Sequence, residues 1–477
     1  MIAALALTAA LVAGDSLPLG EFLARVRDAH PQARQAEAAR RQARADLRAA
    51  RGGFDPYVQA TWDFKRFKGI GYYDELDTRL VVPTPWGVDL KLGWERAAGA
   101  IINPERKTPG EGLLSAGVSL PIGPRLLMDE RRTALRQSEL ALEGAEADAD
   151  AALARLLQAA AQAWGSWYEA EARLRVAREG VALARFRLDA VRQRVAAGDA
   201  AAIDSLEARA EWEKRLLTEV EAVASLTAAR LTVEAYLWDA RGAPVPLADG
   251  ARPVLAESDA RGLAVAGAAA AVTASPDAIV RLARTHPAAQ KARAQWLQAE
   301  AARRLALVQV LPSASAEVSA LAAGRSLGAL PSADEFDEND KASASVKVPL
   351  FARRELGRLR AAEERARQLA AERDRVERDV TVVVERAAVE LRAVEAQRDG
   401  QARVLAATEA LLAAEQRRFE IGESSLLIVN LRERAVLDER LRSAQLEGRR
   451  AAATGALAAA LGTPQLLLGE TVAAPRR

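Results

Sequence analysis

The chain has no cysteine and only two histidines among its 477 residues. The lack of cysteine excludes a disulfide framework, a thiolate-ligated zinc site, a thiol nucleophile and a lipid-modified N-terminal cysteine. Aromatic residues make up 4%, and 67 Lys and Arg are nearly balanced by 65 Asp and Glu, leaving a net charge of +2. A nucleic-acid-binding chain carries a clustered basic excess, so no nucleic-acid partner is expected.

Long apolar runs are also missing. No stretch beyond the N-terminus reaches the ~18 consecutive apolar residues of a membrane-spanning helix, so a membrane would have to be crossed by strands. Residues 1–14 form an apolar segment that ends in small residues, as a secretory signal peptide does, although its basic start is absent. A short buried helix is the alternative for this segment.

Chemistry-bearing motifs are absent too. The sequence has no glycine-rich phosphate loop, no Ser/His/Asp arrangement and no cluster of metal ligands. We therefore expect no enzyme activity, no catalytic residue, no cofactor and no metal.

The chain contains a tandem duplication. Its two histidines both precede proline, at His30-Pro31 and His286-Pro287, and their separation is 286 − 30 = 256 residues. Pro56 and Pro312 have the same separation, whereas Val118 and Val346 further along are 346 − 118 = 228 residues apart. The first repeat therefore carries an insertion of about 28 residues after Pro56. Each histidine is interpreted as the start of a helix, because proline favours the first helical position.

Strand periodicity follows Pro56 and Pro312. Apolar and polar residues alternate strictly, which predicts strands with one apolar face. Loops are expected at 69–77, 97–112 and 324–340. A small sheet packed on helices and a membrane barrel both fit the pattern, and the aromatic residues of this region favour the barrel. The alternating apolar positions are Val58, Ala60, Trp62 and Phe64; Val88, Leu90, Leu92 and Trp94; Leu114, Ala116, Val118 and Leu120; Ala314, Ala316, Val318 and Ala320; Ala342, Ala344, Val346 and Val348.

Long helices follow the strands. A seven-residue repeat of Leu, Ala and Val runs from Leu135 to Val195, which predicts a coiled-coil seam. One helix over 125–195 would be about 105 Å long. It would end near Gly198, and its counterpart over 353–419 would end near Gly422, because glycine suits the residue that stops a helix. A returning helix after each glycine completes a hairpin.

Four repeat-matched strands are too few for a membrane barrel, for which about eight is the minimum. Copies of the chain must then pool their strands. The segment 76–94 of the insertion adds a further hairpin or lengthens an external loop; the sequence leaves both open.

This organisation resembles the TolC-type family of outer-membrane efflux proteins. The resemblance rests on the duplicated helix, strands and long hairpin, the His-Pro pairs, the Val-x-x-Pro step at Val118 and Val346, and the Arg-x-x-x-Gly motifs at Arg194 and Arg418. It implies an α+β, mainly α fold in which long helical hairpins and short strands complete a transmembrane β-barrel and a periplasmic α-barrel on oligomerisation. It also implies an outer-membrane homotrimer with a twelve-stranded barrel, which serves as a passive conduit of a tripartite efflux or type I secretion system. Its partners would be a periplasmic adaptor protein, an inner-membrane pump and outer-membrane lipid. The alternative is a soluble coiled-coil scaffold.

The expected organisation starts with a signal-peptide-like segment, 1–14, followed by the first repeat, 15–238, with strands in 57–121 and a hairpin over 125–238. A linker, 239–275, leads to the second repeat, 276–463, with strands in 313–349 and a hairpin over 353–461, and the tail is 464–477.

Site residues come from the resemblance. It places the adaptor contact at the hairpin tips, on Arg194, Gly198, Asp199, Arg418, Gly422, Glu423 and Ser424. Asp199, Asp204 and Glu423 are candidate pore-aperture carboxylates; a solvated first turn of a helix explains such carboxylates equally well. The family's Asp-x-Leu-x-Ala stretch is kept at Asp204 but replaced by Val429-Asn430-Leu431-Arg432-Glu433 in the second repeat.

Overall fold

The computed structural model describes residues 16–126, 128–254, 258–273, 275–324 and 339–468. The signal-peptide-like segment lies outside these residues. The chain forms two compact units. The helical unit comprises Met1–Ala39, Ala147–Ala289 and Val376–Arg477, and the sheet unit comprises Arg40–Glu146 and Gln290–Arg375.

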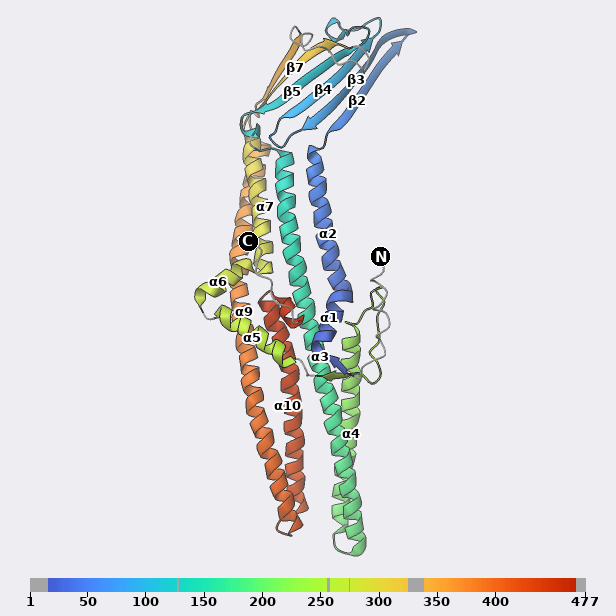
Figure 1. The fold of residues 1–477 in the computed structure, drawn as a ribbon, viewed down its shortest axis with the longest axis vertical. Coiled ribbons are helices and arrows are strands. Elements are labelled where there is room, and N and C mark those ends of the chain that lie inside the picture. The colour runs from blue at the N-terminus through green and yellow to red at the C-terminus, as the bar shows by residue number, and fades with distance from the viewer. Residues whose placement is uncertain (1–15, 127, 255–257, 274, 325–338, 469–477) are drawn as a thin grey trace. The chain divides into compact units, whose positions relative to one another are not determined.

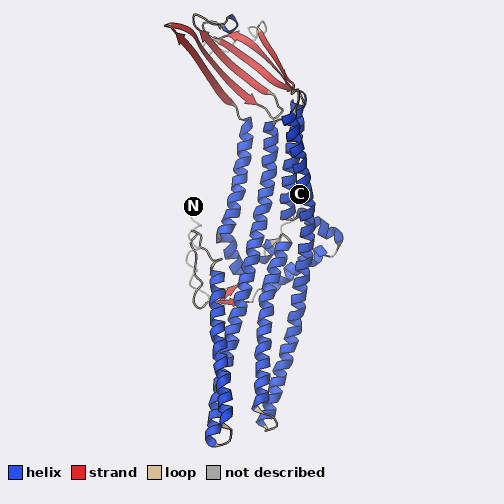
Figure 2. Cartoon of the chain, turned by 180° about the vertical axis from the view of Figure 1, so that it is seen from behind, coloured by secondary structure: helices blue, strands red, loops and turns tan. Residues whose placement is uncertain are grey.

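The sheet unit is built on one antiparallel sheet of six strands, drawn in red in Figure 2. Neighbouring strands in the order β2-β3-β4-β5-β7-β8 are hydrogen-bonded. Among the described residues, β2 and β8 each pair on one side only, so they form the two free edges of this sheet. Strands β5 and β7 join the two repeats. The strands are β2 (Tyr57–Phe67), β3 (Ile70–Pro83), β4 (Asp89–Ala98), β5 (Leu113–Ile122), β7 (Ser313–Ala323) and β8 (Asp340–Lys347).

The register places the alternating apolar residues of every strand on the same face. One row of directly paired residues runs Val82, Leu90, Val118, Val318 and Ala342 from β3 to β8. The neighbouring row, on the opposite face, carries Lys91 of β4 and Lys341 of β8. The sheet thus has one apolar and one polar face, as its period of two predicts.

The insertion in the first repeat forms strands β3 and β4. The loop expected over 69–77 is therefore wrong, because β3 begins at Ile70. Lys68 and Gly69 turn the chain within two residues, with φ of 50° and 79°. Positive φ at both positions is the signature of the tightest hairpin turn, whose twist matches that of the strands. Glycine tolerates this conformation and lysine does so at some cost, which is why the turn is hard to recognise from sequence.

Two helices of 68 residues dominate the chain (Figure 1), and each is about 100 Å long at the usual rise per residue. The first starts five residues later than predicted, because Gly123–Leu126 forms a 3-10 turn. Each is followed by a returning helix, so the two predicted hairpins are present. The four helices are α3 (Glu130–Ala197), α4 (Ala202–Glu234), α9 (Arg353–Glu420) and α10 (Leu426–Ala460).

The predicted seam of α3 is buried within the helical unit. From Ala149 to Val191, every seventh residue is at most 7% exposed. The small side chains let helices approach closely: a Cβ atom added at Gly165 of α3 would lie 2.4 Å from the backbone oxygen of Gly448 in α10. The core continues through Trp164, whose indole nitrogen donates to the Leu17 carbonyl oxygen at 3.1 Å. Alanine and glycine therefore set the spacing between helices, and a few large side chains fill the centre.

The segment expected as an irregular linker has more structure than predicted. It contains β6 (Arg252–Val254), which pairs in parallel with β1 (Ser16–Pro18), and helix α5 (Ser258–Thr273). The alanine-rich composition of α5 has high helix propensity, which outweighs its glycines. The remaining short elements are η1 (Gly52–Phe54), η2 (Pro104–Arg106) and η4 (Pro464–Leu468).

Among the described residues, no single helix has the length and apolar composition to cross a membrane. The pair Ala264–Thr273 and Asp277–Thr285, bent by 115°, passes that test only when its halves are combined.

The two histidines sit at equivalent helix junctions. His30 separates α1 (Leu19–Ala29) from α2 (Pro31–Arg51), and His286 separates α6 (Pro276–Thr285) from α7 (Pro287–Val310). In each case the ring Nδ1 accepts a hydrogen bond at 3.2 Å from the backbone N–H two residues later, in Gln32 and Ala288. The prediction that the histidines mark helix starts is confirmed, and the imidazole itself caps the following helix.

The caps require neutral imidazole rings. Burial lowers the pKa of both His30 and His286 below the ordinary value, and a protonated ring would lose the Nδ1 acceptor. The unfolded chain then binds protons more readily than the folded one. The stabilisation by the caps is complete above the unfolded pKa of about 6.5, and it decreases as the pH falls through the lower folded pKa.

We expect replacement of both histidines by asparagine to remove a pH dependence. Asparagine retains a capping acceptor but does not titrate in this range. Between pH 7.5 and 5.5, the unfolding midpoint of the wild-type protein should fall more than that of the H30N/H286N variant, as measured by circular dichroism. Parallel curves for the two proteins would show that the caps do not titrate.

Candidate functional site at the two hairpin tips

The first hairpin tip lies between α3 and α4. Gly198 has φ of +85°, a left-handed conformation that glycine adopts without strain. The N–H of Asp199 donates to the Arg194 carbonyl oxygen at 2.9 Å, and the N–H of Gly198 donates to that of Val195 at 3.1 Å. This pair of bonds satisfies the last carbonyl groups of α3 and ends the helix.

The second tip, between α9 and α10, repeats this geometry. Gly422 has φ of +80°. The N–H of Glu423 donates to the Arg418 carbonyl oxygen at 2.8 Å, and the N–H of Gly422 donates to that of Phe419 at 3.0 Å. The duplication seen in the sequence therefore extends to individual hydrogen bonds.

The arginine of each Arg-x-x-x-Gly motif has a local structural role. The guanidinium of Arg194 donates to the Asp199 carbonyl oxygen at 3.5 Å, and that of Arg418 donates to the Glu423 carbonyl oxygen at 3.3 Å. Each arginine lies in the last turn of its helix and spans the turn that follows, because its guanidinium reaches the residue after the glycine. Motif recognition alone does not reveal this bond, which depends on the left-handed glycine.

The three candidate aperture carboxylates differ in their surroundings. Asp204 accepts a hydrogen bond at 3.2 Å from the N–H of Ala201 and so caps the first turn of α4. Glu423 lies 4.0 Å from Arg418, and its side chain is 66% exposed. Asp199 is exposed. Asp204 therefore has a structural role as a helix cap, whereas the carboxylates of Asp199 and Glu423 are exposed at the tip surface.

The structure adds one tip residue that sequence analysis missed. Glu415 of α9 is 8% exposed, and its carboxylate accepts a hydrogen bond from the Ser424 hydroxyl. Arg418 lies 3.8 Å from the same carboxylate. The half-buried Ser424 therefore ties the second tip to α9, the helix that precedes it. Glu415 resembles the many solvated glutamates of α9, so nothing in the sequence singles it out.

Ion pairs join the two hairpins within the helical unit. Arg187 of α3 pairs with Glu433 of α10, and their side chains are only 15% and 12% exposed. Arg434 of α10 lies 2.6 Å from Glu211 of α4. Because 433 − 187 = 246 residues separate the first pair, no local sequence signal could have revealed it.

The burial of Arg187 has an electrostatic consequence. Desolvation lowers its pKa to about 10, and the nearby cations Arg434 and Arg215 act in the same direction. The guanidinium still remains charged at neutral pH, so Glu433 faces a permanent positive partner. Within the described ranges, no group of three or more His, Asp or Glu side chains has an arrangement that could hold a metal ion.

A family model described as "Outer membrane efflux protein" matches residues 23–237 and 278–463. The chain belongs to this family. The two matched segments each contain a long hairpin with its tip. No curated protein matches the sequence significantly.

Solved outer-membrane channels share the fold of this efflux protein. The channel CusC is 17% identical, with a TM-score of 0.62 over 93% of this chain and 92% of CusC. The Campylobacter jejuni channel CmeC is 14% identical, with a TM-score of 0.61 over 94% and 86%. The open-state Neisseria gonorrhoeae channel MtrE is 17% identical, with a TM-score of 0.59 over 94% and 89%.

Family membership decides between the two functions that the sequence left open. The protein is an outer-membrane efflux channel component, with helices that extend into the periplasm, and it is not an enzyme. The soluble coiled-coil scaffold is not supported. The α+β, mainly α fold with long helical hairpins is confirmed.

Removing one member of the buried pair should destabilise the helical unit. Arg187→Met leaves the Glu433 carboxylate buried without its partner, which costs about 3 kcal/mol of unfolding free energy. The double variant R187M/E433L replaces the pair by apolar side chains and should recover most of this loss. Urea unfolding monitored by circular dichroism measures both changes.

Arg440→Met on α10, the helix that carries Glu433, is the matched control. Arg440 pairs with Glu179 and Glu409, but all three side chains are 44% to 47% exposed. Its loss should cost less than about 1 kcal/mol. Equal losses for R187M and R440M would contradict a special role for the buried pair.

Proposed function

We propose that three copies of this efflux protein form a homotrimer that acts as a passive conduit from the periplasm to the exterior. Their sheets would close a transmembrane β-barrel, and their hairpins would form a periplasmic α-barrel. The observation that carries this proposal is the open sheet with two free edges, β2 and β8. An edge strand in hydrocarbon leaves N–H and C=O groups without partners, at several kcal/mol each.

The directions of the edge strands suit closure by identical copies. All strands are antiparallel to their neighbours and their number is even, so β2 and β8 run in opposite directions. The β8 strand of one copy can therefore continue the antiparallel order with β2 of the next. Every residue of both edge strands is exposed in the single chain. A ring of copies buries both edges of each chain in the same kind of contact.

The hairpin tips suit contact with other proteins. We assign the adaptor contact to Arg194, Gly198, Asp199, Arg418, Gly422, Glu423 and Ser424. Large apolar side chains flank these residues, among them Ile203 at 62% and Ile421 at 71% exposure. Grouped exposed apolar side chains with charged neighbours are typical of interaction sites. A periplasmic adaptor protein would occupy the tips and connect the channel to an inner-membrane pump.

The same tips would close the resting channel. Asp199, Asp204 and Glu423 would ring the aperture, and adaptor binding would replace contacts between protomers so that the hairpins splay. The tip carboxylates would favour the passage of cations. The proposed division of the chain remains two repeats, 15–238 and 276–463, and the two segments matched by the family model support it.

The assembly is tested by native mass measurement of the protein extracted from isolated outer membranes. We expect a species of three times the chain mass of 51.0 kDa, less any cleaved leader. Recovery from the soluble fraction as a monomer would refute both the location and the closure of the sheet by identical copies.

The aperture is tested by locking the tips. Because the chain has no cysteine, Asp199→Cys together with Glu423→Cys introduces the only thiols. Oxidation should link neighbouring tips in the trimer and abolish export, and a reductant should restore it. The serine versions of both substitutions control for loss of the carboxylates. Unaltered export by fully cross-linked trimers would contradict opening at the tips.

A further inference from the structure

We infer that the inserted hairpin β3–β4 is part of the membrane wall, so that each chain contributes six strands and a trimer closes a barrel of eighteen. The count of eighteen rests on the proposed trimer, whereas the membrane position of the hairpin rests on contacts within one chain. The family resemblance alone implies four strands per chain, with the insertion as an external loop equally compatible. The contacts of β3 and β4 favour a position in the membrane-spanning sheet.

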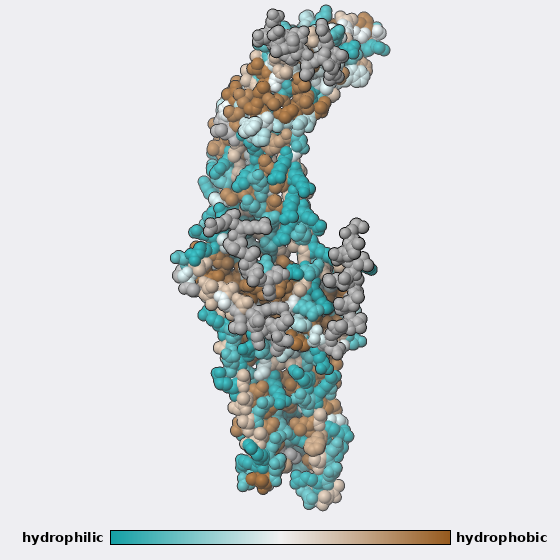
Figure 3. All heavy atoms as spheres, viewed as in Figure 1, coloured by the Kyte–Doolittle hydropathy of each residue, from teal (hydrophilic) through white to brown (hydrophobic). Residues whose placement is uncertain are grey.

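The apolar face of the sheet continues across the inserted strands. Leu90 and Leu92 of β4 are 46% and 44% exposed, compared with 43% for Val118 of β5 and 57% for Val318 of β7. Strand β4 of the insertion thus exposes its apolar side chains to a similar extent as the repeat-matched strands, and Leu90, Val118 and Val318 are directly paired in one continuous row. Figure 3 shows apolar atoms gathered in a band across the sheet. In a hairpin outside the membrane, this apolar face would be exposed to water, which is unfavourable.

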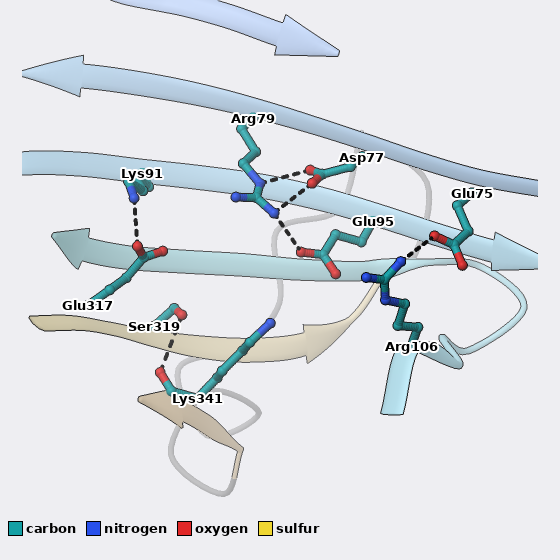
Figure 4. A network of polar contacts seen from close by, with 9 residues as sticks. All are labelled: Glu75, Asp77, Arg79, Lys91, Glu95, Arg106, Glu317, Ser319 and Lys341. Atoms are coloured by element: carbon teal, nitrogen blue, oxygen red, sulfur yellow. Dashed lines mark hydrogen bonds and ion pairs between the residues drawn. The ribbon is translucent and has the colours of Figure 1, made fainter. Parts of the chain in front are cut away.

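The polar face is continuous as well (Figure 4). Lys91 of the insertion reaches past Gly117 of β5 to Glu317 of β7, with 2.6 Å between Nζ and Oε2. A side chain at Gly117 would crowd Ser319 on β7, since an added Cβ would lie 2.7 Å from the Ser319 Cβ. Arg79 of β3 pairs with Asp77 at 2.6 Å and with Glu95 of β4 at 3.5 Å. Lys91, Arg79 and Glu95 of the inserted strands are thus paired on the face that would line the pore.

The inserted strands have the lengths and ends of membrane-spanning strands. Strands β3 and β4 contain 14 and 10 residues, and about 9–11 tilted residues cross a bilayer. Trp86 lies in the turn between them at 76% exposure, and Trp94 is the sixth residue of β4. The ten residues of β4 extend about 30 Å along the strand, which is enough for a tilted strand to cross the apolar band of an outer-membrane barrel. The exposed Trp86 at the turn suits a membrane–water interface, which tryptophan favours.

The turn between β3 and β4 is anchored to the start of α3. Arg131 donates to both carboxylate oxygens of Asp89, at 2.9 and 3.2 Å. A Cβ added at Gly87 would lie 2.9 Å from the Arg132 guanidinium, so the turn packs closely on this helix. The hairpin is fixed at its base as well as along its length.

A six-stranded contribution changes the pore. Three chains give 3 × 6 = 18 strands. At equal tilt, barrel diameter grows in proportion to strand number, so the barrel is about 1.5 times as wide as one of twelve strands, and barrels of 16–18 strands leave an open aqueous channel. The membrane segment would then admit bulkier cargo, and the narrowest point of the conduit would fall on the hairpin tips.

The test is cysteine accessibility in the full-length protein reconstituted into phospholipid vesicles. In the inserted hairpin, Leu80→Cys and Leu92→Cys report the apolar face, and Glu95→Cys reports the polar face. The matched pair on β5 is Val118→Cys and Ser115→Cys, and Lys107→Cys in the exposed loop is a positive control. The probe is a membrane-impermeant maleimide. Trimer formation by each variant is checked on a native gel.

We expect the maleimide to label Glu95→Cys but not Leu80→Cys or Leu92→Cys. This result would match labelling of Ser115→Cys and protection of Val118→Cys on β5. Labelling of all three hairpin positions with protection retained at Val118→Cys would place the hairpin outside the membrane and overturn the inference, while the proposed channel would stand. Labelling at Val118→Cys as well would show that the sheet is not in the bilayer, so the proposed function itself would fail.

Discussion

Backbone hydrogen bonding in hydrocarbon is the constraint on which the rest of the protein depends. A sheet with free edges at β2 and β8 cannot remain open in a bilayer, since each unpaired group costs several kcal/mol. In the proposed homotrimer, the copies would satisfy these edges by joining β8 of one chain to β2 of the next. The proposed oligomer and the proposed conduit thus rest on the same physical requirement.

The helical unit meets a second constraint, which is the close approach of very long helices. Alanine along the seam of α3 and the facing glycines Gly165 and Gly448 bring helix backbones together. Few large side chains remain to fix the hairpins, and Trp164 and the buried Arg187–Glu433 pair serve this role at separate places. Dense packing around Trp164 and the buried ion pair nearer the tips thus hold the two hairpins together at two separate places in the helical unit.

The duplication of the sequence is expressed at the level of single bonds. His30 and His286 cap equivalent helices through the same ring nitrogen, and Arg194 and Arg418 close equivalent turns. The two repeats also differ in two features. The second tip has the added Glu415–Ser424 bond, and the first repeat has the inserted hairpin. These two differences lie at a hairpin tip and in the sheet.

The sequence by itself determined the duplicated architecture, the long hairpins and the alternation of the strands. These features depend on periodicity and on local residues such as Gly198 and Gly422, which act within one turn of the chain. It did not determine that α5 is a helix, that Lys68-Gly69 is a two-residue turn, or that the insertion pairs within the sheet. Only the tertiary structure decided the Arg187–Glu433 pair and the Lys91–Glu317 pair, which join residues far apart in sequence. Such contacts leave no periodic signal, because they depend on which faces of separate elements meet after folding.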